Sequence, residues 1–250
     1  TWLAFLNNDT EVEPDWLDRL VEAASSRPDV GAVTSRIVYM DDPRIIDSAG
    51  DGYLRAGGAF KRGHGDERAR WGDGGEVFGA CGAACMIRRD LFETLGGFDE
   101  AFFMTFEDVD LSYGIQLAGE RCVYAPRAIV RHAGSASLGR LSRQAIFLGQ
   151  RNLEWVYWKN TPWPLLLRSL PSHALYELAA AVHFARAGAL GTFLGAKWAA
   201  LVGVAGLLPK RRARQRLRRV SCRELWRRME PGWLGIKLKE KPFDLVAARK

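Results

Sequence analysis

Short apolar runs recur along the first 130 residues at the spacing of buried strands. The run Trp2 to Leu6 ends in the polar sequence Asn7-Asn8-Asp9-Thr10, which is typical of a strand that opens into a loop. Val30 to Tyr39 is rich in β-forming residues, and a Gly-studded stretch between Gly50 and Gly75 indicates loop and hairpin. Further strands are predicted at Val77 to Ile87, Cys122 to Tyr124 and Ala128 to Arg131.

Helical patterns lie between these runs. Pro14 suits the first residue of a helix that stops at Arg27-Pro28. Asp90 is predicted to cap a short helix that ends at Gly96-Gly97, and a further helix is predicted from Glu107 to Leu117. Strands that alternate with helices in this way predict an α/β fold.

The character of the sequence changes to continuous helix from about Leu141. The stretch Trp163 to Leu208 is largely apolar, but Arg168, Lys197 and other charged residues interrupt it. An uncharged run of about 18 residues, long enough to span a bilayer, is therefore missing, and a helical hairpin lying on a surface is expected. The sequence divides into a region at 1–140 and a helical, amphipathic region at 141–250.

The composition is that of an ordinary globular chain, with 48% apolar, 11% aromatic and 26% charged residues. It excludes disorder, collagen and a disulfide scaffold. The four cysteines have no paired C-x-x-C spacing for zinc, and a reducing compartment is the default. The chain starts without Met or a basic segment of a signal peptide, and we expect it to be a fragment.

Positive charge is concentrated at one end of the chain. Residues from Lys210 to Lys250 include about 15 basic and 4 acidic side chains, and the run Lys210 to Arg219 is of the kind that acidic phospholipid headgroups attract. No aromatic residues are interleaved in this run, which argues against nucleic acid as the partner. The alternative is a solvated helix packed on the remainder of the protein.

Asp9 follows the first predicted strand. A carboxylate there lies at the edge of a sheet where open α/β folds bind ligands, and it suits Mg²⁺ or Mn²⁺. An Asx-turn explains the same residue types without any ligand.

Three carboxylates lie within one turn in the sequence Phe106-Glu107-Asp108-Val109-Asp110. Acidic residues at a helix N-terminus are favoured by the helix dipole, and this is the simpler explanation. The aromatic residues immediately before them would desolvate the acids, which favours a raised pKa and a general base.

Two further side chains have both a structural and a functional interpretation. His132 closes a predicted strand, and it is either a structural histidine or a metal ligand. Arg151 and its basic neighbours either clamp phosphate oxygens or lie on the surface.

Five motifs together resemble the family 2 glycosyltransferases of GT-A fold, especially their rhamnosyltransferase-like branch. They occur in the family's order over about 130 residues, and Arg151-Asn152 and the apolar helices are also similar to that branch. The motifs are Phe5-Leu6-Asn7-Asn8-Asp9-Thr10, Gly82-Ala83-Ala84-Cys85-Met86-Ile87-Arg88-Arg89, Gly96-Gly97-Phe98-Asp99-Glu100, Glu107-Asp108-Val109-Asp110-Leu111 and His132.

The resemblance implies a fold and a role for each motif. It implies an α/β, GT-A-like mixed sheet with flanking helices, truncated at its N-terminus because the family's first nucleotide-binding units are missing, followed by an α-helical region. Asn7-Asn8-Asp9 looks like the DxD element, with Asn in its first position, and Asp9 and His132 match its metal-binding positions. Asp108 matches the catalytic base. The remaining assignments are Asn7, Asn8 and Arg151 at the donor and Gly82, Phe106, Glu107 and Asp110 at the acceptor.

The function expected from this resemblance is inverting transfer of a sugar from a nucleotide-sugar donor to a hydroxyl acceptor, with Mg²⁺ or Mn²⁺. The expected acceptor is lipid-linked or a polysaccharide, and the expected place is the cytoplasmic, inner face of the membrane, bound peripherally to anionic lipid. Two alternatives stay open: an inactive membrane-bound scaffold, and a metal-dependent phosphotransferase or hydrolase that uses the same acids.

Overall fold

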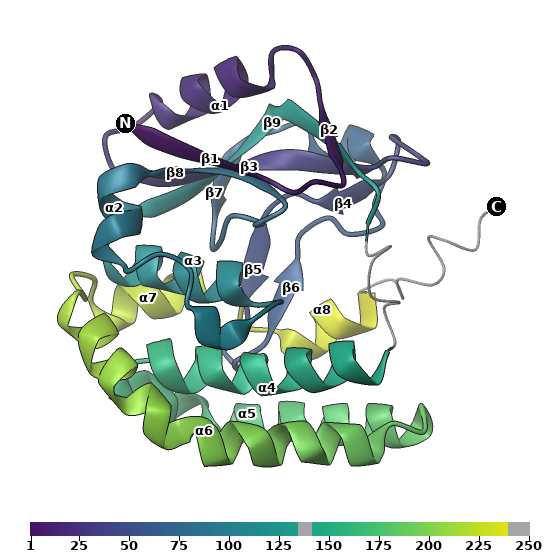
Figure 1. Ribbon diagram of the computed structural model, residues 1–250, viewed down its shortest axis with the longest axis vertical. Coiled ribbons are helices and arrows are strands. Elements are labelled where there is room, and N and C mark those ends of the chain that lie inside the picture. Colours follow the sequence, from purple (N-terminus) through teal and green to yellow (C-terminus); the bar gives the residue numbers. More distant parts are fainter. Residues whose placement is uncertain (135–141, 240–250) are drawn as a thin grey trace.

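Layers of helices and one mixed sheet make up the computed structural model, which describes residues 1–134 and 142–239 (Figure 1). Helix α1 (Trp16–Ala24) covers one face of the sheet, and α2 (Arg89–Thr94) and α3 (Glu107–Leu117) cover the other. Helix α4 (Arg143–Asn160) lies beneath α3, and a hairpin of α5 (Trp163–Arg186) and α6 (Leu190–Arg216) forms the outermost layer.

The sheet has seven strands and confirms the expected mixed α/β architecture. Across it lie, in order, β1 (Trp2–Leu6), β8 (Ala84–Arg88), β3 (Val30–Tyr39), β9 (Arg121–His132) and β2 (Thr10–Val12), while β4 (Ile46–Ser48) pairs with β3 and β7 (Gly75–Val77) with β9. Only β3 and β9 run parallel among these pairs. Every residue of β3 is buried, as expected for a strand with helices on both faces.

The smaller elements connect the sheet to the helical layers. They are a hairpin of β5 (Asp51–Tyr53) and β6 (Ala59–Lys61), the 3-10 turns η1 (Arg68–Trp71) and η2 (Glu100–Phe102), and the helices α7 (Cys222–Arg228) and α8 (Trp233–Lys239). Glu230 exchanges backbone hydrogen bonds with Tyr53 and Arg55, both at 2.9 Å, so the segment after α7 is attached to the end of β5.

Several sequence expectations are confirmed and three are wrong. The strands Trp2–Leu6 and Val30–Tyr39 and the helix Glu107–Leu117 are where they were predicted. Val77 to Ile87 is not one strand, because Gly79 exchanges two backbone hydrogen bonds with Asp51 (2.9 and 3.0 Å) and turns the chain away between β7 and β8.

The other two errors concern β9 and α2. The two short strands predicted near the end of the sheet are one strand, β9, whose register with β3 shifts between Ser35 and Arg36. Asp90 does not cap α2 but lies in its first turn, since Arg88 occupies the cap position.

A buried ion cluster joins α3 to the helical region. Asp110 is fully buried, and its Oδ2 accepts hydrogen bonds from Lys159 Nζ at 2.7 Å and Arg214 at 3.1 Å, while its Oδ1 accepts one from Asn160 at 2.7 Å. Lys159 also donates to Asp99 at 2.7 Å. This cluster therefore ties α3 to α4 and α6.

Gly114 on α3 makes room for the cluster. A Cβ atom at this position would lie 1.9 Å from a guanidinium nitrogen of Arg214. Glycine in a helix interior is unfavourable by roughly 1 kcal/mol relative to alanine. The absence of a side chain here is therefore explained by the arginine that passes over this turn to reach Asp110.

The basic run Lys210 to Arg219 does not face solvent as a whole, which corrects the expectation of one lipid-binding cluster. Lys210 is paired with Asp99, and Arg211 and Arg214 are buried. Exposed guanidinium groups remain only at Arg212, Arg216, Arg218 and Arg219 within this run. Part of the run thus stabilises the fold.

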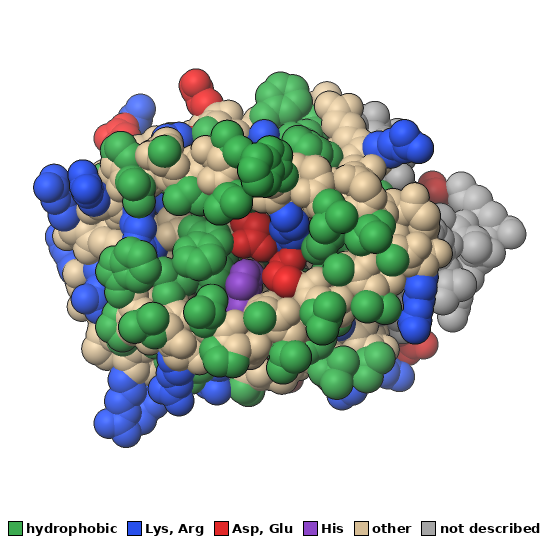
Figure 2. Space-filling view, turned by 90° about the horizontal axis from the view of Figure 1, so that it is seen from below, with side chains coloured by type: hydrophobic (Ala, Val, Ile, Leu, Met, Phe, Trp, Pro, Cys, Tyr) green, Lys and Arg blue, Asp and Glu red, His purple; other side chains and the backbone are tan. Residues whose placement is uncertain are grey.

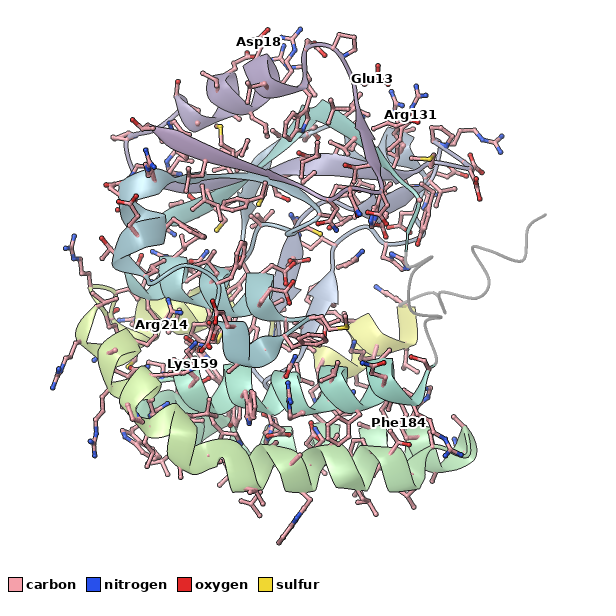
Figure 3. The ribbon with its side chains drawn as sticks, viewed as in Figure 1. Glu13, Asp18, Arg131, Lys159, Phe184 and Arg214 are labelled. Carbon is pink, nitrogen blue, oxygen red and sulfur yellow. The ribbon has the colours of Figure 1, made fainter. Side chains whose placement is uncertain are left out.

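Removing one charge of the buried cluster is expected to destabilise the protein strongly. The change Lys159→Met leaves Asp110 and Asp99 without a shared cation, and we expect a loss of about 3–5 kcal/mol in the free energy of unfolding. Arg131→Met is the control, because Arg131 pairs with Glu13 at the surface, far from Lys159 and Arg214 in Figure 3, where a loss below about 1 kcal/mol is expected. Urea denaturation measures both, and equal losses would contradict the role of the cluster.

Candidate active site

Asp9 and His132 meet at one edge of the sheet. The pairing of β2 with β9 puts Thr10 opposite His132, and the backbone N–H of Ala133 donates to the carbonyl of Asp9 at 3.0 Å. As a result, His132 Nε2 lies 3.4 Å from Asp9 Oδ1. Two side chains separated by more than 120 positions in the sequence are thus brought to the same point.

Asp47, at β4, holds His132 from behind. Its Oδ2 lies 2.8 Å from His132 Nδ1, and both of its oxygens accept hydrogen bonds from Lys61 Nζ at 3.0 Å. Burial alone would raise the pKa of Asp47, but the charge of Lys61 and the hydrogen bonds of His132 and His64 outweigh it and hold this pKa well below its ordinary value. Asp47 is therefore a carboxylate that fixes the ring of His132.

This arrangement fits a divalent metal. Metal-bound histidines commonly direct their second ring nitrogen at a carboxylate, which fixes the ring orientation and tautomer. Asp47 does this for His132, and the Nε2 atom is left facing the partly exposed carboxylate of Asp9. The side chains of Asp9 and His132 could hold Mg²⁺ or Mn²⁺ together with oxygens of a bound ligand.

Asp108 lies at the N-terminal end of α3 and faces a glycine. Its Oδ2 accepts a hydrogen bond from the backbone N–H of Gly82 at 2.8 Å, and its Oδ1 accepts one from Val109 N at 2.8 Å. A Cβ on Gly82 would lie 3.0 Å from the Cβ of Asp108, which is closer than ordinary contact. The motif that begins at Gly82 thus positions this carboxylate.

Glu107 shows the raised pKa that the aromatic surroundings predicted. Burial, and then the charge of Asp108, raises the pKa of Glu107 to about 7. One of its oxygens, Oε2, is buried and has no hydrogen-bond partner among the residues that the structure describes. A carboxyl group in this state changes its charge near neutral pH.

Asp51, at the start of β5, is a second buried acid beside Asp108. Ligand atoms of Asp51, Cys81 and Asp108 all lie within 4.8 Å of one another. In the described part of the chain, Oδ2 of Asp51 has no hydrogen-bond partner. Burial and the charge of Asp108 raise the pKa of Asp51 well above its ordinary value. The surroundings of Asp51 therefore favour its neutral form over its carboxylate.

A strained loop leads into the acidic motif. Phe103, Thr105 and Phe106 have φ of 64°, 61° and 69°, a region that is unfavourable for residues other than glycine by about 1–3 kcal/mol each. Asn152 on α4 donates to the carbonyls of Phe102, Met104 and Thr105 at 2.8–2.9 Å. The amide of one helical residue thus clamps the loop in this conformation.

Arg151 takes part in the same clamp rather than pointing freely into a donor site. Its guanidinium donates to the carbonyls of Ala101 and Phe102, both at 3.3 Å, and lies 4.2 Å from the ring centre of Trp155. The predicted contact of Arg151 with donor phosphate would require these bonds to be given up.

The remaining predicted site residues differ in how exposed they are. Asn7 and Asn8 are exposed beside Asp9. Phe106 is partly buried and packs on a hydrophobic cluster that includes Val109 and Tyr113. Asp110, predicted at the acceptor, is fully buried in the ion cluster, so this prediction is wrong: its side chain has no surface left to contact a substrate.

Sequence reasoning missed the supporting residues Asp47, Asp51, Lys61 and His64. They lie in and beside the Gly-rich stretch that the sequence indicated only as loop and hairpin. The spacing of Asp47 and Asp51 gives no recognisable ligand pattern, and their roles arise from the folding of this stretch against β9 and α3.

Comparison with known proteins decides the family. The sequence profile described as "Glycosyltransferase like family 2" matches residues 1–146, more than half of the chain. The chain belongs to this family. The resemblance carried by the five motifs is thereby confirmed.

Two curated relatives of this family 2 chain have names that refer to O-antigen biosynthesis and to rhamnosyl transfer. It is 35% identical over 151 residues to the O-antigen biosynthesis protein RfbC of Myxococcus xanthus, covering 54% of the chain and 11% of that protein. It is 32% identical over 178 residues to an N-acetylglucosaminyl-diphospho-decaprenol L-rhamnosyltransferase of Mycobacterium tuberculosis, covering 62% of the chain and 57% of that enzyme. The chain thus spans less than two thirds of either relative.

Two solved structures are more distant. GalNAc-T7 with UDP, GalNAc and Mn²⁺ matches with a TM-score of 0.45 and 17% identity, over 62% of this chain and 31% of that one. The mannosyltransferase PcManGT from Pyrobaculum calidifontis, in complex with GDP-Man and Mn²⁺, matches with a TM-score of 0.42 and 17% identity, over 96% and 63%.

Replacing Asp51 by Asn is expected to stabilise this family 2 chain in a pH-dependent way. The pKa of Asp51 is raised in the folded state, so its contribution to stability is fully present below the unfolded value of about 4 and is lost as the pH rises through the folded value. Asp51→Asn should therefore raise the free energy of unfolding by about 1–3 kcal/mol at neutral pH, with a smaller gain near pH 4.

Urea denaturation at several pH values measures this difference. The same substitution at the exposed Asp18 on α1 serves as the control and should show no pH-dependent gain. A loss of stability in Asp51→Asn that is constant with pH would contradict the raised pKa of Asp51.

Proposed function

We propose that this chain is the catalytic part of an enzyme that transfers a sugar from a nucleotide sugar to a hydroxyl acceptor, with inversion at the anomeric carbon. The observation that carries the proposal is the joint placement, in a family 2 chain, of Asp9 with His132 and of Asp108 with Gly82. The relatives' names support a role in the synthesis of a polysaccharide or a lipid-linked saccharide.

The acceptor side of the reaction rests on Asp108. Its carboxylate, anchored by the N–H groups of Gly82 and Val109, accepts the proton of the acceptor hydroxyl as that oxygen bonds to the anomeric carbon. The bond from the anomeric carbon to the diphosphate breaks on the opposite face of the sugar. Glu107, beside Asp108 and partly exposed, is the second acceptor-side carboxyl group in this proposal.

The donor side rests on the edge of the sheet at Asp9. Asn7 and Asn8 offer exposed amides there, and Asp9 and His132 would hold Mg²⁺ or Mn²⁺. When bound, such an ion neutralises charge on the leaving diphosphate. Asp47 and Lys61 keep His132 oriented for this task.

The place of action that we propose is the cytoplasmic face of the membrane, with the protein bound peripherally. A lipid-linked acceptor, as in the name of the Mycobacterium tuberculosis relative, would then meet the site at the membrane surface. The exposed arginines of α6 and of the segment after it supply attraction to anionic lipid.

Sugar transfer is tested by incubating the protein with a panel of nucleotide sugars, including an activated rhamnose, Mn²⁺ and hydroxyl acceptors. Product that depends on both sugar and acceptor supports the proposal. Release of nucleotide without an acceptor would indicate a hydrolase, and the absence of both reactions would indicate a scaffold.

The change Asp108→Asn is expected to lower the turnover number by about a hundredfold to ten-thousandfold, because the general base is lost. Donor affinity, measured by titration calorimetry, should change little. Asp90→Asn is a matched control, since Asp90 also lies in the first turn of a helix and is exposed at the surface. Near-normal turnover in Asp108→Asn would rule out its role as base.

Asp9→Ala and His132→Ala are each expected to weaken Mn²⁺-dependent donor binding by at least about tenfold, because each removes a ligand of the ion. Calorimetry of the nucleotide sugar with and without Mn²⁺ measures this effect. Glu13→Ala, just beyond β2 and paired with Arg131, controls for loss of charge near the site. Donor binding by the unchanged protein that is insensitive to a chelator would contradict the metal site.

A further inference from the structure

The outer face of the α5–α6 hairpin is apolar, and within residues 1–134 and 142–239 no further layer of the protein covers it. Trp198 is 67% exposed, Leu201 63% and Leu178 62%. Figure 2 shows that hydrophobic side chains gather over this face. We define the α5–α6 face by the exposed residues Trp163, Leu167, Leu170, Leu175, Leu178, Val182, Leu190, Leu194, Trp198, Leu201, Val202 and Leu208.

We propose that the α5–α6 face enters the boundary between headgroups and acyl chains of a lipid bilayer, and that this apolar insertion rather than the basic run is the main attachment of the protein. The inference deepens the membrane part of the proposed function, since it names the surface and the interaction that bring the enzyme to a lipid-linked acceptor. Lipid contact of this kind depends on apolar area and is supplemented by charge.

Helix α6 lies along the protein and not across a membrane. By length and composition it could span a bilayer, and only 22% of its apolar window is buried. Its other side, however, is fixed to α4: Trp155 donates to the carbonyl of Ala200 at 3.2 Å, and Lys197 donates to Glu154 at 2.8 Å. A helix held along its length in this way offers one stripe to the lipid.

Charged side chains at the centre of the face set the depth of insertion. A hollow visible in Figure 2 exposes acidic, basic and His side chains, and a cavity of about 510 Å³ here is lined by Glu154, Glu177 and Lys197 among apolar neighbours. Lys197 Nζ lies 2.6 Å from Glu177, and His173 Nε2 lies 3.4 Å from Glu154. Moving such groups into hydrocarbon is unfavourable, so the face stays at the level of the headgroups.

A bilayer fits this face better than a second protein copy. Two exposed tryptophans lie on this face, Trp163 at the start of α5 and Trp198 within α6. Tryptophan is enriched where membranes meet water. Exposed arginines flank the apolar stripe of α6, with Arg186 before it and Arg212 and Arg216 after it. Cations beside an apolar stripe complement anionic headgroups.

Flotation of the full-length protein with vesicles tests the inference. One set is phosphatidylcholine alone, and the other contains phosphatidylglycerol. The unchanged protein should float with both, more strongly with the anionic set, and should stay bound to the neutral set in high salt. The double change Trp198→Glu and Leu201→Glu should lower the partition coefficient by about a hundredfold, because two large apolar side chains are lost from the contact.

The matched control is Leu17→Glu with Val21→Glu, which alters two exposed apolar residues of α1 on the opposite side of the molecule. It should float like the unchanged protein, and thermal unfolding checks that both double variants fold. Binding only to anionic vesicles, with loss in high salt, would overturn the inference in favour of charge alone.

Two other results would also overturn it. One is equal flotation of the α5–α6 face variant and the control. The other is a stable dimer in ultracentrifugation that the face variant abolishes, without vesicle binding, which would assign the face to a second copy. Flotation does not depend on enzyme turnover, so the flotation result stays valid if sugar transfer is not observed. Sugar transfer can likewise be measured in solution if the protein does not bind vesicles.

Discussion

The ion cluster around Asp110 is the interaction that fixes α3, which packs on the sheet, against the helices α4 and α6. Lys159 from α4 and Arg214 from α6 converge on a carboxylate of α3 that is fully buried. Charges withdrawn from water are tolerated only when they are paired closely, so the three helices have one acceptable arrangement. Because Asp108 lies two residues before Asp110 on α3, the position of the proposed base is fixed by helices that contribute nothing to the sheet.

Local sequence patterns predicted the elements whose own residues carry a clear signal, even where their partners in the fold are distant in the chain. The run Val30–Tyr39 is rich in β-forming residues and is buried throughout, because both of its faces are covered. The helix Glu107–Leu117 carries its own start and stop signals. Val77 to Ile87 misled the same reasoning, since its apolar residues are needed on both sides of a bend that the distant Asp51 creates. A bend fixed by a long-range contact leaves no periodic signal.

The residues of the candidate site also fall into those that the sequence predicted and those that it did not. Asp9, His132 and Asp108 were predicted through the family resemblance, and their assigned roles stay predictions, although the fold places Asp9 and His132 together. Asp47 and Lys61 could not be predicted, because a carboxylate that orients a histidine has no fixed spacing from it in the sequence. The basic run after Pro209 was predicted as one cluster because its charges were counted without regard to the helix faces. Helical periodicity turns Arg211 and Arg214 inward and Arg212 outward.

The clamp of Asn152 on the loop before Glu107 bears on how this protein could be re-engineered. Three left-handed residues stay in place because an amide on α4 binds three carbonyls of the loop. A chimera that joins the sheet of this chain to the helices of another relative would release the loop unless the donor of those helices carries the same amide at the same turn. A chimera should therefore take the sheet and α4 from the same protein, so that Asn152 stays with the loop that it binds.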